Sequence, residues 1–131
     1  MKLINLQGKV SLITGASRGI GKSIAESLAE AGARVAIGYK DDEEGARLAA
    51  RRCGDSSLLV RGDVADPADC RRIVAEVLQR AEKLDILVNN AATSERDSFS
   101  MPYEAWIIHW QRIMATNLLS AVNISFWRSN R

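Results

Sequence analysis

The chain has 131 residues, of which 47% are hydrophobic and 26% are charged, and its 18 Lys and Arg against 16 Asp and Glu leave a formal net charge of +2. This length suits one domain with a buried core, and the near-balance of charge argues against a surface that follows nucleic-acid phosphates. No apolar run approaches the roughly 18 residues of a membrane span. The two cysteines form no CxxC motif, so we expect no metal site and a reducing, cytoplasmic location.

Short apolar runs alternate with helical patterns along the first half of the chain. Residues 10–14 (VSLIT) predict a buried strand, and apolar residues at helical spacing then predict a helix that Gly32 ends. Residues 34–39 (RVAIGY) and 57–60 (SLLV) predict a second and a third strand. Between them, residues 42–52 predict a short helix.

The second half continues the alternation. Asp66 is typical of a helix N-cap and Pro67 of the first helical position, and an apolar helical face follows them. Residues 84–88 (LDILV) predict a fourth strand, and residues 106–121 carry the apolar spacing of a last helix. The polar end of the chain, about 125–131, is expected to form an irregular tail.

Strands that alternate with helices at this pace predict an α/β fold with βαβ units. Right-handed crossovers then place helices on both faces of a doubly wound parallel sheet. Ligands of such sheets bind beyond the carboxyl ends of the strands. The polar and glycine-rich motifs of this chain follow the predicted strands, so we expect them to meet at one edge.

The glycine-rich stretch TGASRGIG (14–21) fits two kinds of phosphate-binding loop. ASRGIGKS (16–23) is one glycine short of the P-loop pattern GxxxxGK(S/T), and Asp63 could be the magnesium-holding carboxylate, although Arg61 and Gly62 interrupt the apolar run before it. Alternatively, the glycines let the loop approach the pyrophosphate of a dinucleotide, where a helix N-terminus attracts the anion.

Four motifs in order favour the dinucleotide. TGASRGIG (14–21), GDV (62–64), NNAA (89–92) and TNL (116–118) together resemble the classical short-chain dehydrogenase/reductase family, from near residue 8 to about residue 124. The resemblance implies a Rossmann-type fold and an oxidoreductase that transfers hydride between a nicotinamide cofactor and a carbonyl/alcohol pair. A P-loop nucleotide-binding protein becomes the less favoured alternative.

The resemblance also assigns a set of cofactor-binding residues. It implies that Asp63 accepts a hydrogen bond from the adenine amino group, that Ala91 lies along the adenosine ribose, and that Asn89 ties neighbouring strands together beside the cofactor. Ala92 stands where the family has a glycine. The complete set of expected cofactor contacts is Gly15, Ser17, Arg18, Gly19, Ile20, Gly21, Lys40, Asp63, Val64, Asn89 and Ala91.

The end of the second strand bears on the choice of cofactor. A carboxylate at that position bonds the ribose of NAD, but this chain has Gly38-Tyr39-Lys40 there. Arg18 and Lys40 can pair with the additional phosphate of NADP, and Arg18 is the more expected contact. Asp41 and Asp42 weaken the argument. We therefore expect NADP(H) in preference to NAD(H).

The last predicted helix contains the candidate catalytic residue Asn117. This residue lies on the same helical stripe as Trp110 and Ile113, which predicts that it faces the core. A buried asparagine needs partners for several donors and acceptors. The resemblance implies that Asn117 belongs to the catalytic group and holds a water molecule in its proton relay.

The other catalytic residues of the family are not found in the sequence. The family uses a Ser and a YxxxK motif on a fifth strand and the next helix, but Tyr39 is followed four residues later by Glu43 and Tyr103 by Ile107, and the sequence ends at Arg131. We therefore expect a single, truncated Rossmann domain (1–131) that is inactive alone and would act on a small carbonyl or alcohol substrate if completed. The alternative is a non-catalytic remnant that binds nucleotide or associates with other subunits through the last helix, with no nucleic-acid or membrane partner.

Overall fold

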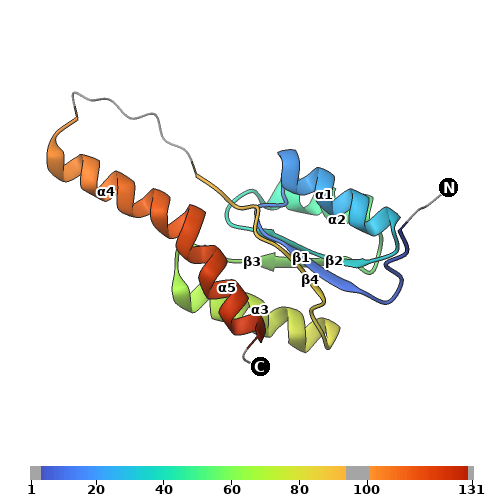
Figure 1. Ribbon diagram of the computed structural model, residues 1–131. Coiled ribbons are helices and arrows are strands. Elements are labelled where there is room, and N and C mark those ends of the chain that lie inside the picture. The colour runs from blue at the N-terminus through green and yellow to red at the C-terminus, as the bar shows by residue number, and fades with distance from the viewer. Residues whose placement is uncertain (1–3, 94–100, 130–131) are drawn as a thin grey trace.

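A parallel four-stranded sheet forms the centre of the protein in a computed structural model that describes residues 4–93 and 101–129. The strand order β3-β2-β1-β4 places the first strand in the middle, as a doubly wound topology requires (Figure 1). The strands are β1 (Val10–Ile13), β2 (Arg34–Tyr39), β3 (Leu58–Arg61) and β4 (Ile86–Val88).

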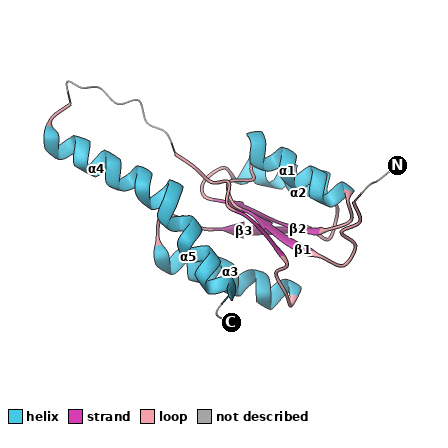
Figure 2. Ribbon diagram, in the orientation of Figure 1, coloured by secondary structure: helices cyan, strands magenta, loops and turns pink. Residues whose placement is uncertain are grey.

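Helices cover both faces of this sheet, which confirms the predicted fold class (Figure 2). One face carries α1 (Gly19–Glu30) and α2 (Glu43–Cys53), and the other carries α3 (Pro67–Ala81) and α5 (Ser120–Ser129). The remaining helix, α4 (Tyr103–Met114), points away from the sheet and continues into α5 through the π-helical turn η1 (Ala115–Leu119).

The sheet separates two hydrophobic cores, because successive strand residues point to opposite faces. Ile13 packs with Val35 on the side of α1 and α2, whereas its neighbour Leu12 packs on the side of α3. Ile124 of α5 is fully buried in that second core. Burying a side chain of this size contributes about 1.5–3 kcal/mol. These contacts fix the sheet whose edge carries the motifs.

The helix boundaries follow the local signals in the sequence. Asp66 caps α3 by accepting a hydrogen bond from the backbone N–H of Ala68 at 2.9 Å, and Pro67 occupies the first turn, as predicted. The first helix ends at Glu30, and Gly32 follows it with a φ of 103°. The predicted strands agree with the observed ones to within two residues at each end.

The expected irregular tail from about residue 125 is wrong for residues 125–129, because α5 continues to Ser129. Tertiary contacts hold this end in place. The Trp127 ring lies 4.7 Å from the guanidinium carbon of Arg71 on α3, and Arg128 donates hydrogen bonds to the backbone oxygens of Leu84, at 3.3 Å, and Asp85. Polar residues in this segment therefore belong to a docked helix. Residues 130–131 lie outside the described part.

Among the residues that the structure describes, no helix is both long and apolar enough to cross a membrane. The same residues contain no group of three or more His, Cys, Asp or Glu side chains that could hold a metal ion.

Candidate functional site

The loops that follow β1, β2, β3 and β4 meet at the carboxyl edge of the sheet (Figure 1). Backbone hydrogen bonds join the glycine-rich loop to both neighbouring strands. The N–H of Thr14 donates to the carbonyl oxygen of Val88 at 3.1 Å, and that of Ala16 donates to Gly38 at 2.9 Å. The loop therefore lies at the carboxyl end of the middle of the sheet, where the sequence predicts the site.

Two glycines let the loop turn tightly into α1. Gly15 has a φ of 63°, which favours glycine, and a Cβ there would lie 2.9 Å from the Cα of Ala91. A Cβ at Gly21 would lie 2.4 Å from the carbonyl oxygen of Gly15 and 2.5 Å from Nδ2 of Asn90. Such contacts leave no room for a side chain, so these glycines are required by the packing of loop, helix and β4.

The beginning of α1 has the properties of an anion site. A Cβ added at Gly19, whose φ is 59°, would meet no heavy atom of the described residues within 4 Å, and Ile20 is 75% exposed. Among the described residues, the first turn of α1 contains no acidic side chain, and Arg18 at its N-cap makes no side-chain capping bond. An uncapped helix N-terminus beside open space attracts a phosphate. The residues present therefore fit a dinucleotide pyrophosphate.

Asn90, and not Asn89, ties β4 to β1. The side-chain amide of Asn90 donates to the carbonyl oxygens of Thr14 at 3.0 Å and Gly15 at 3.1 Å, while Asn89 is exposed. Adjacent residues of extended chain point to opposite sides, and only Asn90 faces the loop. The strand-tying role expected of Asn89 is thus corrected to Asn90, which the sequence reasoning missed. Its signal was the second asparagine of the same NNAA motif.

Asp63 lies at the same edge, after β3, and its carboxylate is held by two neighbours. Oδ1 accepts a hydrogen bond from the backbone N–H of Ala65 at 2.9 Å, and Oδ2 lies 3.5 Å from Nζ of Lys40. Both side chains of this ion pair are partly exposed. The cation expected at the additional phosphate of NADP therefore faces the carboxylate expected at the adenine.

Other expected contacts occupy different environments. The side chain of Val64 is buried in the core beneath α3, so only its backbone can face the edge of the sheet. Arg18 is exposed at the start of α1. Asp42 caps α2 by accepting a hydrogen bond from the N–H of Gly45 at 2.9 Å. The carboxylate of Asp42 therefore stabilises the start of α2. Ser17 lies half-buried in the glycine loop.

Asn117 lies in the π-helical turn η1 and bonds to the loop after β4. Its Oδ1 accepts a hydrogen bond from the N–H of Thr93 at 2.7 Å, and its Nδ2 donates to the carbonyl oxygen of Thr93 at 3.0 Å. The expectation that Asn117 faces the core is wrong, because its side chain is exposed. The π-turn departs from the regular helical spacing on which that expectation rested. Thr93 is a second residue that the sequence reasoning missed.

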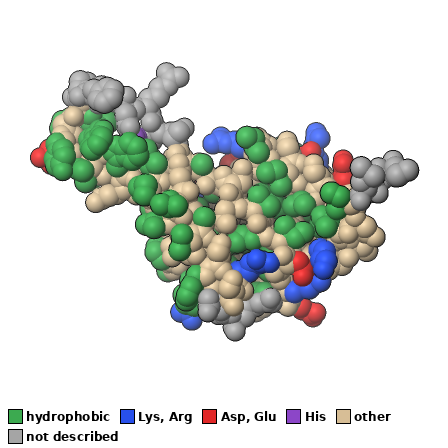
Figure 3. All heavy atoms as spheres, viewed as in Figure 1, with side chains coloured by type: hydrophobic (Ala, Val, Ile, Leu, Met, Phe, Trp, Pro, Cys, Tyr) green, Lys and Arg blue, Asp and Glu red, His purple; other side chains and the backbone are tan. Residues whose placement is uncertain are grey.

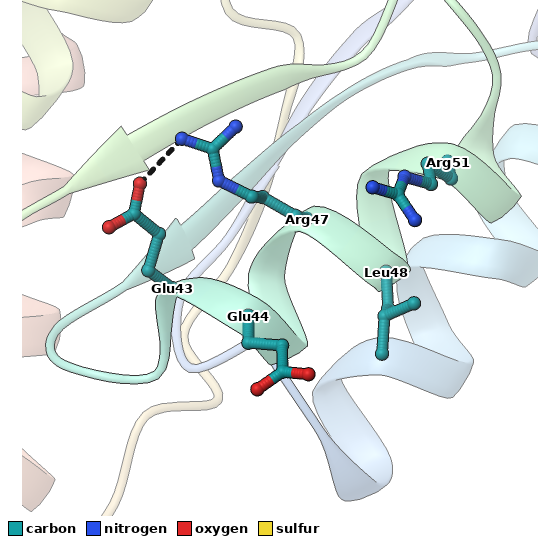
Figure 4. Close-up of a pocket in the computed structure, with 5 residues that line it drawn as sticks. All are labelled: Glu43, Glu44, Arg47, Leu48 and Arg51. Carbon is teal, nitrogen blue, oxygen red and sulfur yellow. Dashed lines mark hydrogen bonds and ion pairs between the residues drawn. The ribbon is translucent and has the colours of Figure 1, made fainter.

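Two surface depressions lie near the carboxyl edge of the sheet, one apart from the motif residues and one beginning among them. One, of about 350 Å³, is lined by a single face of α2, where Glu43 and Arg47 pair at 2.6 Å and Leu48 and Arg51 continue the wall (Figure 4). It contains none of the motif residues. The other, of about 560 Å³, runs along α1 from Gly19 to Leu28 and begins at the glycine loop.

Two ionisable groups on α3 have shifted pKa values. A hydrogen bond from the backbone N–H of Asp63 lowers the pKa of the Asp69 carboxyl, and Arg72 lowers it further. Burial raises the pKa of the Cys70 thiol to about 11. Asp69 is therefore ionised at neutral pH and Cys70 is protonated.

The comparisons with known proteins agree with this geometry. Residues 9–127 match the family described as short chain dehydrogenase. The chain is 42% identical over 122 residues to a 3-oxoacyl-(acyl-carrier-protein) reductase of Vibrio cholerae, covering 93% of this chain and 48% of that protein, and 38% identical over 122 residues, with the same coverage, to that of Escherichia coli. The chain thus spans about half the length of these relatives.

Solved structures show the same relationship. A short chain dehydrogenase from Burkholderia cenocepacia in complex with NADP superposes with a TM-score of 0.88 at 33% identity, covering 97% of this chain and 52% of that one. A Pseudomonas aeruginosa RhlG/NADP active-site complex superposes with a TM-score of 0.83 at 36% identity, covering 95% of this chain and 48% of that one.

Proposed function

The chain belongs to the short-chain dehydrogenase family, and from that premise we propose that it holds the pyrophosphate and adenosine of NADP(H) as the cofactor-binding half of a carbonyl/alcohol oxidoreductase. The proposal rests on the geometry at the start of α1. An uncapped helix N-terminus, a loop with positive φ at Gly15 and Gly19, and open space at Gly19 converge at the carboxyl edge of the sheet.

Most of the expected contacts have a separate role in the proposed binding of NADP(H). The N–H groups at the start of α1 bind the pyrophosphate, with Ser17 and Ile20 beside it, and Asp63 accepts from the adenine amino group. Ala91 lies along the adenosine ribose, and Asn89 lies beside the cofactor. Arg18 pairs with the 2′-phosphate, and Lys40 adds a second cation once it leaves Asp63. Two structural relatives, from Burkholderia cenocepacia and Pseudomonas aeruginosa, are in complexes with NADP, which supports this preference.

The nicotinamide would supply or accept the hydride, and the protein must supply a proton donor near neutral pH. In this proposal, Asn117 holds a water molecule at the end of a proton relay while its side chain is oriented by Thr93. The sequence of 131 residues contains no YxxxK motif. We therefore propose that this chain binds the cofactor without reducing carbonyl substrates by itself.

The decisive experiment is calorimetric titration of the purified chain with NADPH and with NADH. We expect NADPH to bind more tightly by on the order of tenfold, because hydrogen bonds to charged groups contribute about 1.5–3 kcal/mol and solvent reduces this at an exposed side chain such as Arg18. Arg18→Ala should remove most of the difference, while Lys22→Ala should leave it unchanged. Magnesium-dependent ATP binding that Lys22→Ala abolishes would instead support the P-loop alternative and overturn the proposal.

Turnover is tested separately with NADPH and common carbonyl substrates, followed by absorbance of the reduced cofactor. Binding without turnover is the expected result. Measurable reduction by the 131-residue chain would show that a proton donor outside the family motif is present, which contradicts the proposed inactivity of the isolated chain.

A second candidate function, subunit association, rests on the exposed apolar residues of α4, η1 and α5. Figure 3 shows hydrophobic side chains gathered over these helices. They include Ile108, Trp110, Met114, Leu118, Val122 and Phe126, each at least 41% exposed. Light scattering after size exclusion, over a hundredfold range of protein concentration, tests this candidate. We expect a dimer or larger species that Val122→Glu disrupts, whereas a monomer at every concentration would reject it.

A further inference from the structure

We propose that Asp69 is a positioning residue that holds Asp63 in place for the adenine base, with Arg72 as its partner. The proposal rests on the proposed function, in which Asp63 reads the adenine amino group. Asp69 and Arg72 lie in the first two turns of α3 and touch the chain on either side of Gly62. Neither residue belongs to the set that the sequence motifs assign to the cofactor.

The first contact fixes the backbone of Asp63. Its N–H donates to Oδ2 of Asp69 at 2.7 Å, a length typical of a charge-assisted hydrogen bond. The carboxylate of Asp63 is then turned by its own bond from Ala65, which leaves Oδ2 as the oxygen directed toward Lys40. The position of that oxygen thus depends on the peptide that Asp69 holds.

The second contact fixes the residue before Gly62. The guanidinium of Arg72 donates to the carbonyl oxygen of Arg61 at 2.8 Å and lies 3.3 Å from Oδ1 of Asp69. A Cβ added at Gly62 would lie 2.7 Å from Cδ1 of Ile73 and 2.9 Å from the Arg72 guanidinium. The segment 61–63 is therefore held against α3 from both ends, and a side chain at Gly62 would have to displace the ends of the Ile73 and Arg72 side chains.

Helix capping does not account for the orientation of Asp69. It is the third residue of α3, where an acidic side chain ordinarily turns back to the N–H of the N-cap residue. Here the N-cap residue Asp66 donates its N–H to the carbonyl oxygen of Asp63 at 2.9 Å and caps the helix with its own side chain. The Asp69 carboxylate instead reaches past the cap to the loop after β3. Its pKa is lowered chiefly by that bond, so it is an acceptor at neutral pH.

Recognition of the adenine base by Asp63 therefore depends on a side chain of α3. Removing the Asp69 acceptor leaves the Asp63 N–H without its partner, so the peptide is free to rotate and the Asp63 carboxylate loses its fixed place. The protein should then no longer bind a base with an amino group at its 6-position more tightly than a base without one. Loss of folding alone would weaken both kinds of ligand equally, so the preference between bases separates positioning from stability.

The experiment compares NADPH with its hypoxanthine analogue, which carries oxygen in place of the adenine amino group, by calorimetric titration. The variants are Asp69→Ala, Asp69→Asn, which keeps one neutral acceptor oxygen, and the control Asp66→Ala, which weakens the start of the same helix without removing the Asp63 contact. The wild type is expected to prefer NADPH by on the order of tenfold. Asp69→Ala should reduce this preference to within about twofold, Asp69→Asn should be intermediate, and Asp66→Ala should retain it.

Amide hydrogen exchange of Asp63 in the ligand-free chain gives a readout that needs no cofactor. Exchange is expected to be slow in the wild type and Asp66→Ala, and faster in both Asp69 variants. An unchanged base preference in Asp69→Ala and Asp69→Asn, or unchanged exchange, would overturn the proposal while leaving the proposed function intact. Wild-type protein that binds no NADPH would instead be a failure of the proposed function, and wild-type protein without base preference would overturn the adenine role of Asp63 and of Asp69 together.

Discussion

Asn90 donates two hydrogen bonds to Thr14, one from its backbone and one from its side chain. The backbone N–H of Asn90 donates to Oγ1 of Thr14 at 3.0 Å, and its side-chain amide donates to the Thr14 carbonyl oxygen at the same distance. The N–H of Ala91 also donates to Oγ1 of Thr14, at 2.9 Å. Thr14 is 3% exposed, so one buried hydroxyl satisfies two consecutive amides and joins the glycine loop to β4.

Replacing Thr14 by the isosteric valine should destabilise the protein by about 2–4 kcal/mol, because two partly buried N–H groups lose their acceptor, at about 1–3 kcal/mol for a fully buried group. Thr14→Ser keeps the hydroxyl and should cost about 1 kcal/mol or less. Urea unfolding followed by circular dichroism measures both. Equal losses in the two variants would mean that the hydroxyl contributes no more than the methyl group does, which would contradict this prediction.

Gly19→Ala should weaken NADPH binding by at least about tenfold while lowering stability by only about 1–2 kcal/mol, the cost of a side chain in the left-handed region. The added methyl group would enter the open space where the phosphate is proposed to bind. Gly8→Ala is the matched control, since Gly8 has a φ of 79° and comparable open space among the described residues but lies before β1. If Gly8→Ala weakened NADPH binding as much as Gly19→Ala does, the effect would be general strain.

The pH dependence of stability should depend in part on Asp69 and Asp85. The backbone N–H of Asp63 lowers the pKa of Asp69, and that of Val10, at 2.8 Å from Oδ2 of Asp85, lowers the pKa of Asp85. A carboxyl whose pKa is lower in the folded state than its usual value of about 3.9 stabilises the protein above that value. This contribution is lost as the pH falls below about 4 through the folded-state pKa.

Urea unfolding of the wild type and Asp85→Asn at pH 6, pH 4 and pH 3 tests this dependence. The wild type should be more stable than Asp85→Asn at pH 6, and the difference should shrink at pH 3, below the usual pKa of a carboxyl, because the unfolded wild-type chain takes up a proton there more readily than the folded protein. A difference that stays constant over this range would contradict the assigned pKa shift.

The two cysteines should differ in reactivity toward iodoacetamide. Cys53, at the end of α2, is half-buried, and burial and then Glu26 raise its pKa. Cys70 is fully buried, with Sγ 3.2 Å from the carbonyl oxygen of Val64 and a pKa raised to about 11. At pH 8 we expect Cys53 to react first and Cys70 only as the protein opens. Mass spectrometry of the timed reaction identifies the modified residue, and faster labelling of Cys70 would show that α3 is loosely packed.

Local patterns were sufficient for most of the fold. The run RVAIGY coincides with β2, and the Asp66-Pro67 pair begins α3 where expected, because strand burial and helix capping depend on residues that are neighbours in the sequence. The four motifs that indicate the family are also short runs of neighbouring residues, so they can be recognised without the structure. The tail was misjudged because its helix is stabilised by Arg71, Leu84 and Asp85, which are distant in sequence.

The sequence by itself determined the family, the order of strands and helices, and the glycine loop above them, since periodicity and motif spacing are properties of the chain alone. Only the tertiary structure decided that Asn90 and not Asn89 ties the strands, that Asn117 bonds to Thr93, and that Lys40 faces Asp63. Each of these depends on which way a side chain points across a gap between elements. That direction is set by how the loops after the strands and the π-turn meet in the folded protein, where each pair joins residues far apart in the sequence, and no local pattern contains it.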